Sequence, residues 1–225
     1  MGEGGVLARP VWQSLHAGWA GRAVRHGSAV RLHRDFGPFA AVDPGGDPAD
    51  LAALANAGEE LWLVEPEPLP PPPGFALTRQ GQLLQMACDG LAGSARSVTA
   101  RVLGDADALA MQALAAVTRP GPFHAHTHRL SDFLGVEDGG RLLAMAGERM
   151  QPPGHAEVSG VCTHPDAQGR GLAAALSWQI AARIVARGQR PFLHVWPDNA
   201  HAVALYQRLG FAESGRPWLS LYTKL

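Results

Sequence analysis

The stretch from residue 156 to residue 175 contains the residue types that an anion-binding turn needs. Residues 158–162 form an apolar-rich run that predicts a short strand, and Pro165 with Asp166 ends that run. The segment 168–173 then opens directly into a helix. One face of this helix is apolar, with a leucine or isoleucine at every fourth position: Leu172, Leu176, Ile180 and Ile184.

A helix that begins in this way exposes backbone donors at its first turn. Those N–H groups have no acceptor within the helix, and the helix dipole adds partial positive charge there. Gly169 and Gly171 lack a β-carbon, so a ligand can approach the backbone closely. A pyrophosphate fits such a turn. The turn is neither a P-loop nor a dinucleotide-binding glycine motif, and a helix start that needs glycine only for packing explains it equally well.

A second motif downstream favours the functional interpretation. Gln168, Gly171 and Ala173, following a strand and a proline, resemble motif A of the GNAT superfamily of acyl-CoA-dependent N-acetyltransferases. Asn199, followed by Tyr206 and the Leu-Gly-Phe of residues 209–211, resembles the second signature of that family. The resemblance covers the C-terminal 130 residues and is sharpest between residues 157 and 211.

The resemblance implies acetyl-CoA as the acyl donor. Its pyrophosphate is expected on the backbone N–H groups of Gln168, Gly169, Arg170, Gly171, Leu172 and Ala173. The central strand is expected to splay from its neighbour at a bulge, so that Val161, Cys162 and Thr163 line the pantetheine arm. Two alternatives stay open: the Arg170 side chain adds charge or is only solvated, and Asn199 binds the pantetheine, caps its helix, or does both.

Glu157 and Tyr206 are the catalytic candidates. Glu157 precedes Gln168 by eleven residues, which resembles the placement of the catalytic carboxylate in the histone-acetylating branch of the family. An amine with a pKa of ~10.4 must lose a proton before attack, and we expect burial to raise the pKa of Glu157. The alternative is a glutamate at the edge of the strand, either held in a salt bridge or exposed to solvent. The resemblance places the Tyr206 hydroxyl near the coenzyme A sulfur, where it is expected to protonate the departing thiolate, and the alternative is a tyrosine packed in the core.

The histidines at positions 124, 126 and 128 would lie on one side of a strand, which suggests a metal. No carboxylate or cysteine at ligand spacing completes such a site, so we expect no metal. The resemblance implies a role in acceptor contact instead, because the GNAT family builds its amine site from the region between the first helix and the second strand. The same cleft is expected to include Glu148, Arg149 and His155.

Composition limits the range of functions. The chain has 225 residues, 46% of them hydrophobic, and a formal net charge of −1, which argues against binding of nucleic acid or an anionic membrane. No apolar run approaches the ~20 residues that span a bilayer, and no secretory signal is recognisable. Cys88 and Cys162 are far apart in the sequence, which favours free thiols and a cytoplasmic location.

The first part of the chain predicts a smaller α/β domain over residues 1–95. Helices are expected over residues 12–19 and 49–57, the second capped by Asp47 and followed by Gly58, and strands over 29–33, 39–42 and 61–64. The proline run 69–73 is interpreted as a rigid connector rather than a partner ligand. This region is a degenerate half-GNAT lobe, an acceptor-shaping domain or a dimer surface, and the sequence does not rank these interpretations.

Residues 96–225 predict a GNAT-like domain with a mixed, mostly antiparallel sheet flanked by helices. Strands are expected over 98–103, 133–136, 142–148, 157–163, 192–196 and 218–225, with Gly210 ending the last helix. The predicted function is transfer of acetyl to a primary amine of a small molecule, amino acid or peptide. The alternatives are longer acyl-CoA donors and a non-catalytic CoA-binding protein, and a homodimer is possible.

Overall fold

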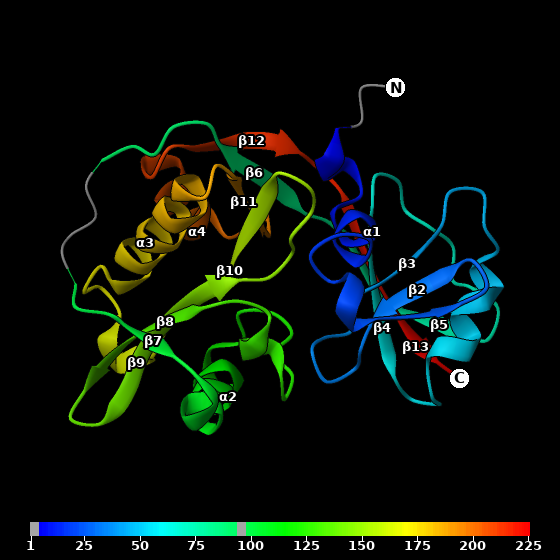
Figure 1. Cartoon of the computed structure of the whole chain (residues 1–225), viewed down its shortest axis with the longest axis horizontal. Helices are drawn as coiled ribbons and strands as arrows, with labels where there is room; N and C mark the ends of the chain where they lie inside the picture. Colours follow the sequence, from blue (N-terminus) through cyan, green and yellow to red (C-terminus); the bar gives the residue numbers. More distant parts are fainter. Residues whose placement is uncertain (1–4, 94–97) are drawn as a thin grey trace.

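The computed structural model describes residues 5–93 and 98–225 and shows a mixed α/β fold (Figure 1). The largest sheet has seven strands: β6 (Leu84–Cys88), β7 (Arg101–Leu103), β8 (Phe133–Asp138), β9 (Arg141–Glu148), β10 (His155–Thr163), β11 (Arg190–Val195) and β12 (Phe211–Gly215). Their order is β12-β6-β11-β10-β9-β8-β7, and every neighbouring pair is antiparallel except β10 with β11. The predicted mixed, mostly antiparallel fold class is confirmed.

Helices cover both faces of this sheet. Successive side chains along a strand point to opposite sides, so one strand can contribute to the core on each face. On one side, α3 (Leu172–Ala186) and α4 (Ala200–Arg208) pack on a core that includes Ala144 and Ala146 of β9. On the other side, α2 (Ala108–Thr118) packs against Met145 of the same strand. The predicted apolar face of α3 is confirmed, since its four leucine and isoleucine residues are all buried.

The remaining strands form two three-stranded sheets. One contains β1 (Ala23–His26), β2 (Ala29–Leu32) and β3 (Ala40–Val42), and the other has the order β4-β13-β5. In the second sheet, β13 (Trp218–Lys224) lies between β4 (Glu60–Glu65) and β5 (Phe75–Gln82). The short helix α1 (Pro10–Leu15) packs against β2, β3 and β4, with Val11 and Leu15 fully or almost fully buried.

Strand pairing connects the two predicted domains in both directions. The C-terminal strand β13 completes a sheet of the N-terminal region, and β6, from the N-terminal region, pairs with β11 and β12. The boundary predicted at residue 95 lies outside the described residues. The sheets are not divided at this boundary, because strands from both predicted domains pair within the same sheet. The functional cleft is therefore bordered by segments from both ends of the sequence.

Several local predictions need correction. The helix expected over residues 12–19 ends at Leu15, and the fully buried Trp19 instead donates its indole N–H to the Arg149 carbonyl at 2.9 Å. Residues 48–54 form a 3₁₀ helix, not an α-helix reaching residue 57, although the predicted Asp47 cap is present. Strands β1, β5, β6 and β12 were not expected, and β7 is shorter than its prediction.

Gly210 ends α4 as predicted, and the structure shows why glycine is needed there. Its φ is +95°, and a β-carbon would lie 2.4 Å from the Gly90 carbonyl oxygen. Within the described residues, no helix is long and apolar enough to cross a membrane.

Candidate active site

The central strands separate at the point where a ligand could enter the sheet. The parallel pairing of β10 with β11 ends at Glu157 and Phe192, beyond which β11 continues beside β6 alone. The pairing of β10 with β9 shifts register between Ser159 and Cys162. Gly160 occupies this bulge with φ +62°, where a β-carbon would come within 2.8 Å of the Phe133 ring. The expected splay and bulge are both present, and they leave backbone groups of β10 without a neighbouring strand.

The turn before α3 presents backbone donors to solvent. Gly169 and Gly171 have φ values of +75° and +78°, and residues 168–171 are exposed. Within the described parts of the chain, the N–H groups of residues 169–174 donate to no protein acceptor. The N–H of Gln168 is different, because it donates to the Pro165 carbonyl at 3.2 Å. The bare donors at the start of α3 fit a diphosphate, and Gln168 has no free backbone donor to add.

A cleft of about 500 Å³ lies beside the splay and brings together Arg149 and three residues expected at the coenzyme. Val161 comes from the bulge of β10, whereas Asn199 and Tyr206 come from the start and the middle of α4. The opposite wall belongs to the β4-β13-β5 sheet, which contributes Trp62 and Leu219 among others. The side chain of Cys162 lies on the α2 side of the sheet, in a cluster with Met111 and Phe133, where burial raises the pKa of its thiol to about 11.

Glu157 is buried beneath this cleft, and its carboxylate oxygens are fully engaged. Its side chain is 1% exposed. Arg149 donates from Nε and Nη2 to the two oxygens, each at 2.8 Å, and the Met150 N–H donates at 3.2 Å. The Nδ1 atom of His194 lies 2.8 Å from Oε1. Glu157 is thus held in a buried salt bridge, the alternative to catalysis that the sequence left open.

The charge state of Glu157 differs from the expectation. Burial alone would raise the pKa of its carboxyl, as predicted. The charge and hydrogen bonds of Arg149, together with the His194 hydrogen bond, outweigh that penalty and hold the pKa well below its ordinary value. A carboxylate that binds protons so weakly is a poor proton acceptor in its own right.

Tyr206 has the protonation state that a general acid needs. It is half-buried and meets Phe211 edge-on, with 6.0 Å between the ring centroids. Burial and the nearby charge of Glu157 raise the pKa of Tyr206 to about 12. The phenol therefore keeps its proton throughout the neutral range and can donate it inside the cleft.

Comparison with known proteins identifies the fold family. The family model described as FR47-like protein matches residues 133–219. A solved structure from Novosphingobium aromaticivorans, assigned to the GNAT family of acetyltransferases, is 46% identical, with a TM-score of 0.93 over 98% of this chain and 99% of that chain. The chain belongs to the GNAT family. A search of curated proteins gave no match.

More distant GNAT structures share the fold across nearly the whole chain. A GCN5-related N-acetyltransferase from Kribbella flavida is 20% identical, with a TM-score of 0.64 over 96% of this chain and 95% of that chain. A GCN5-related N-acetyltransferase-like protein from Streptococcus suis is 13% identical, with a TM-score of 0.58 over 95% of this chain and 92% of that chain. Coverage this high includes the N-terminal region as well as the GNAT signatures.

The remaining predicted residues of this GNAT chain fall into different environments. Asn199 caps α4, since its Oδ1 accepts from the Ala202 N–H at 3.1 Å, and it also lines the cleft. Of the three residues expected around the acceptor, only Arg149 lines the cleft. Glu148 pairs with Arg187 at 2.7 Å, and His155 lies beside a separate hollow. The Thr163 hydroxyl is buried with no partner among the described residues.

The three histidines of residues 124–128 point to different partners. The segment forms a turn and a short 3₁₀ helix, so the strand-like alternation does not apply. His124 meets the Arg34 carbonyl at 2.7 Å, His126 lies 3.6 Å from Asp35, and His128 is buried against Asp105 at 2.9 Å. Only His124 lines a hollow, which adjoins the cleft through Trp62 and Pro122.

Among the basic side chains that line the cleft, sequence reasoning missed His194, Arg79 and Arg119. His194 lies in a strand that was predicted, two residues after Phe192, and a histidine within an apolar strand was a usable signal. Its contact with Glu157 depends on the parallel register of β10 and β11, which no local pattern gives. Arg79 lies in β5, a strand that the sequence did not indicate.

Proposed function

We propose that this GNAT protein transfers an acetyl group from acetyl-CoA directly to a primary amine of a small molecule, amino acid or peptide. The observation that carries the proposal is the set of N–H groups at residues 169–174 that have no acceptor in the described chain, on the same fold as the splayed strand and the cleft with Tyr206. Acetyl-CoA would supply an activated thioester. The N–H groups of Gly169, Arg170, Gly171, Leu172 and Ala173 would bind its diphosphate.

The thioester end would lie in the cleft between Val161 and Tyr206. Backbone groups at the bulge of β10 would bind the pantetheine arm as a neighbouring strand would, and an N–H there would polarise the carbonyl. Asn199 would add an amide beside the arm while it caps α4. As the amine nitrogen bonds to the carbonyl carbon and the carbon–sulfur bond breaks, the Tyr206 hydroxyl would donate its proton to the departing thiolate. The proton that the attacking nitrogen loses would then return, directly or through water, to the Tyr206 phenolate.

The acceptor must enter as a neutral amine, and the charges of the cleft favour that form. Three arginines line the cleft, Arg79, Arg119 and Arg149, of which Arg149 is paired with Glu157, and no aspartate or glutamate is among the described residues that line it. Positive surroundings disfavour the ammonium form, so the amine would release its proton to water as it binds. Glu157 would act as a positioning group, because its carboxylate fixes both Arg149 and His194 at the wall of the cleft.

Binding and turnover test the proposal separately. Millimolar acetyl-CoA should raise the melting temperature, since a ligand that binds only the folded state stabilises it by RT ln(1 + [L]/Kd). Release of free coenzyme A thiol in the presence of an amine panel should then report transfer. No thermal shift with acetyl-CoA would refute the proposal. Binding of acetyl-CoA without turnover on any amine would favour a non-catalytic CoA-binding protein. Faster turnover with longer acyl chains would favour an acyltransferase that uses longer acyl-CoA donors.

A further inference from the structure

Two arginines on opposite walls of the cleft have no acidic partner in the part of the chain that the structure describes. Arg79 projects from β5 and stacks on the Trp196 ring, with its guanidinium carbon 4.2 Å from the ring centroid. Arg119 follows the last residue of α2. Across residues 5–93 and 98–225, neither side chain forms an ion pair or a hydrogen bond, and both line a cleft that contains no carboxylate. Two exposed guanidinium groups that line one cavity without an acidic partner fit an anionic ligand.

The backbone of Arg119 supports this interpretation. Its φ and ψ are 50° and 56°, and it is the only non-glycine residue with a positive φ among the described residues. Glycine is the usual residue at this position after a helix, since it adopts the left-handed conformation without strain. An arginine here accepts backbone strain and places a cationic side chain at the cleft. Strained non-glycine residues are concentrated at ligand-binding sites.

We propose that the acceptor carries a carboxylate close to its amine, as an amino acid does, and that Arg79 and Arg119 bind this carboxylate. The proposal rests on the proposed function and narrows its acceptor class. A guanidinium binds a carboxylate through charge-assisted, often paired hydrogen bonds, and two of them would orient the acceptor with its amine toward Val161 and Tyr206. The same positive charges favour the neutral amine needed for attack.

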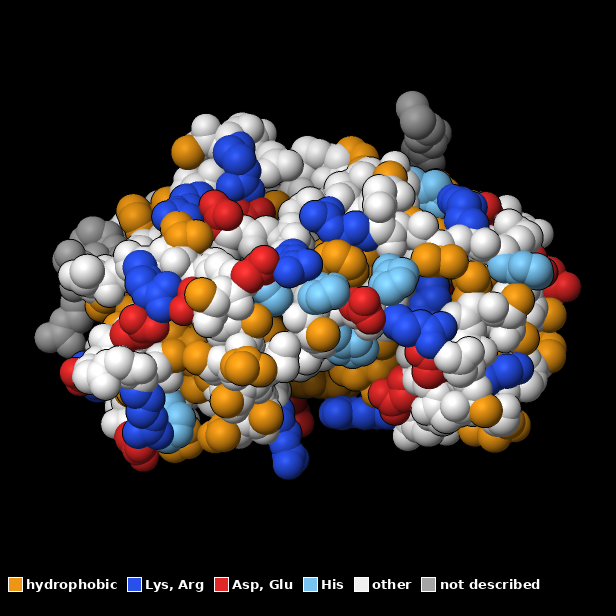
Figure 2. All heavy atoms as spheres, turned by 60° about the horizontal axis from the view of Figure 1, so that its bottom comes forward, with side chains coloured by type: hydrophobic (Ala, Val, Ile, Leu, Met, Phe, Trp, Pro, Cys, Tyr) orange, Lys and Arg blue, Asp and Glu red, His pale blue; other side chains and the backbone are white. Residues whose placement is uncertain are grey.

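A second hollow of about 680 Å³ provides room for the rest of the acceptor. Trp62 and Pro122 line both cavities, so the hollow continues outward from the cleft. Figure 2 shows this face hollowed between the two parts of the molecule, with hydrophobic side chains inside and basic ones at the rim. The volume falls within the range of ordinary small-molecule sites.

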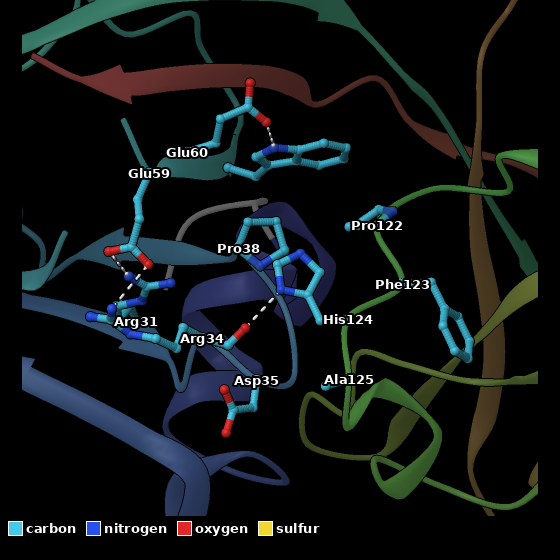
Figure 3. A pocket seen from close by; sticks show the side chains of 11 residues that line it. Arg31, Arg34, Asp35, Pro38, Glu59, Glu60, Pro122, Phe123, His124 and Ala125 are labelled. Carbon is cyan, nitrogen blue, oxygen red and sulfur yellow. Dashed lines mark hydrogen bonds and ion pairs between the residues drawn. The ribbon is translucent and has the colours of Figure 1, made fainter. Parts of the chain in front are cut away.

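Most charges around this hollow already have protein partners. Figure 3 shows Glu59 directed toward Arg31 and Arg34, and the ion-pair distances are 3.7 and 3.3 Å. The Glu60 carboxylate accepts a hydrogen bond from the indole of Trp62 at 3.2 Å. Apolar surface comes from Pro38 and Phe123. These contacts fit an uncharged, apolar or aromatic side chain of the acceptor. The acceptor class is therefore an amino acid with a large apolar side chain.

Titration calorimetry with matched acids and amines tests the inference without turnover. Protein saturated with coenzyme A is titrated with L-phenylalanine and 2-phenylethylamine, and with L-leucine and 3-methylbutylamine. The amino acid of each pair should bind at least about ten-fold more tightly than the amine that lacks its carboxylate. This is the effect expected of charge-assisted hydrogen bonds. Arg79→Met and Arg119→Gly should each remove most of this preference. Arg119→Gly fits the local backbone, so it should fold. Arg141→Met is the control, because Arg141 pairs with Asp166 and lines neither cavity, and it should keep the wild-type preference.

The outcomes separate this inference from the proposed function. Equal binding of acid and amine, or no binding of either, overturns the inference, even if acetyl-CoA is bound and consumed. A preference for acids that both arginine variants retain also overturns it. If the variants instead lower the affinity for acetyl-CoA, the two arginines bind a coenzyme A phosphate and the inference fails. A preference for acids lost in both variants upholds the acceptor site, even if no thioester is ever turned over.

Discussion

The turn before α3 and the charge cluster under the cleft are built in opposite ways. The N–H groups of residues 169–174 have no acceptor in the described chain, and the turn is exposed. Glu157 is 1% exposed, and each of its oxygens has protein donors, from Arg149, Met150 and His194. One region has its hydrogen-bonding capacity free for a ligand, and the other has used it within the protein.

This difference separates groups that bind from groups that hold others in place. An unpaired donor at the surface costs little, because water satisfies it until a ligand arrives. A buried carboxylate without partners would cost several kcal/mol, so its partners are part of the fold. Substitutions in the cluster should therefore change stability first, whereas substitutions at the turn should change coenzyme affinity first.

Arg149→Met should give the largest effect, on stability. Removing the guanidinium leaves the Glu157 carboxylate buried with only its Met150 and His194 contacts, and breaking a buried pair costs about 3–5 kcal/mol. Urea unfolding followed by tryptophan fluorescence measures the change. Arg141→Met is the control, because Arg141 pairs with Asp166 at the surface and such pairs contribute about 0–1 kcal/mol. Equal losses of unfolding free energy in the two variants would mean that the buried Glu157 cluster contributes no more to stability than a surface ion pair.

Tyr206→Phe should lower kcat by about a hundred-fold, at the low end of the range for a lost general acid. The affinity for acetyl-CoA should stay close to that of the wild type, because the turn before α3 is unchanged. Since the pKa of Tyr206 is about 12, wild-type kcat should show no loss from its ionisation up to about pH 9. Steady-state kinetics across that range measure both quantities. Retention of full kcat would remove Tyr206 from the chemistry.

Ala173→Asp should weaken acetyl-CoA binding by about ten-fold without destabilising the fold. A carboxylate in the first turn of α3 interacts favourably with the helix dipole, by about 0.3–1 kcal/mol, yet it repels a diphosphate. Calorimetric titration with acetyl-CoA and urea unfolding measure the two effects. Ala173→Asn, which is similar in size but neutral, is the control and should bind more tightly than the aspartate variant. Unchanged affinity in Ala173→Asp would place the diphosphate elsewhere.

Acid should remove the contribution of Glu157 to stability. The folded pKa of this carboxyl lies below the unfolded value of about 4.3, so its stabilisation is present above that pH and is lost as the pH falls toward the folded pKa. The loss is at most about 1.4 kcal/mol per pH unit. The difference in unfolding free energy between wild type and Glu157→Gln should narrow from pH 5 to pH 3. A constant difference would mean that Glu157 has no lowered pKa.

The elements with local signals were predictable from the sequence. The apolar stripe of α3, the glycine turn before it and the hairpin of β8 and β9 each lie within one short segment, so their patterns predict them directly. The GNAT signatures then identified the family. Gly210 was predictable too, because a helix C-terminus needs a residue with positive φ.

The assembled cleft was not predictable, because it depends on pairing between distant segments. Arg79 reaches the site only because β5 pairs with β13, which is far along the chain. His194 meets Glu157 only in the observed register of β10 and β11. The pKa of Glu157 is lowered because Arg149, which follows the last residue of β9, donates hydrogen bonds to its carboxylate. From burial alone, the sequence analysis expected the pKa to rise. The cytoplasmic location and the homodimer stay predictions.

The placement of β13 constrains the order in which the molecule can form. β4 and β5 are separated in space by a strand that a ribosome makes last among the described elements, so their facing edges stay unpaired while most of the chain is synthesised. Exposed edges of this kind invite pairing with other chains. Contacts so distant in sequence also close slowly. The wall opposite Tyr206 is consequently completed only after the C-terminal segment has emerged, so a nascent chain can contain both family signatures before it has a finished cleft.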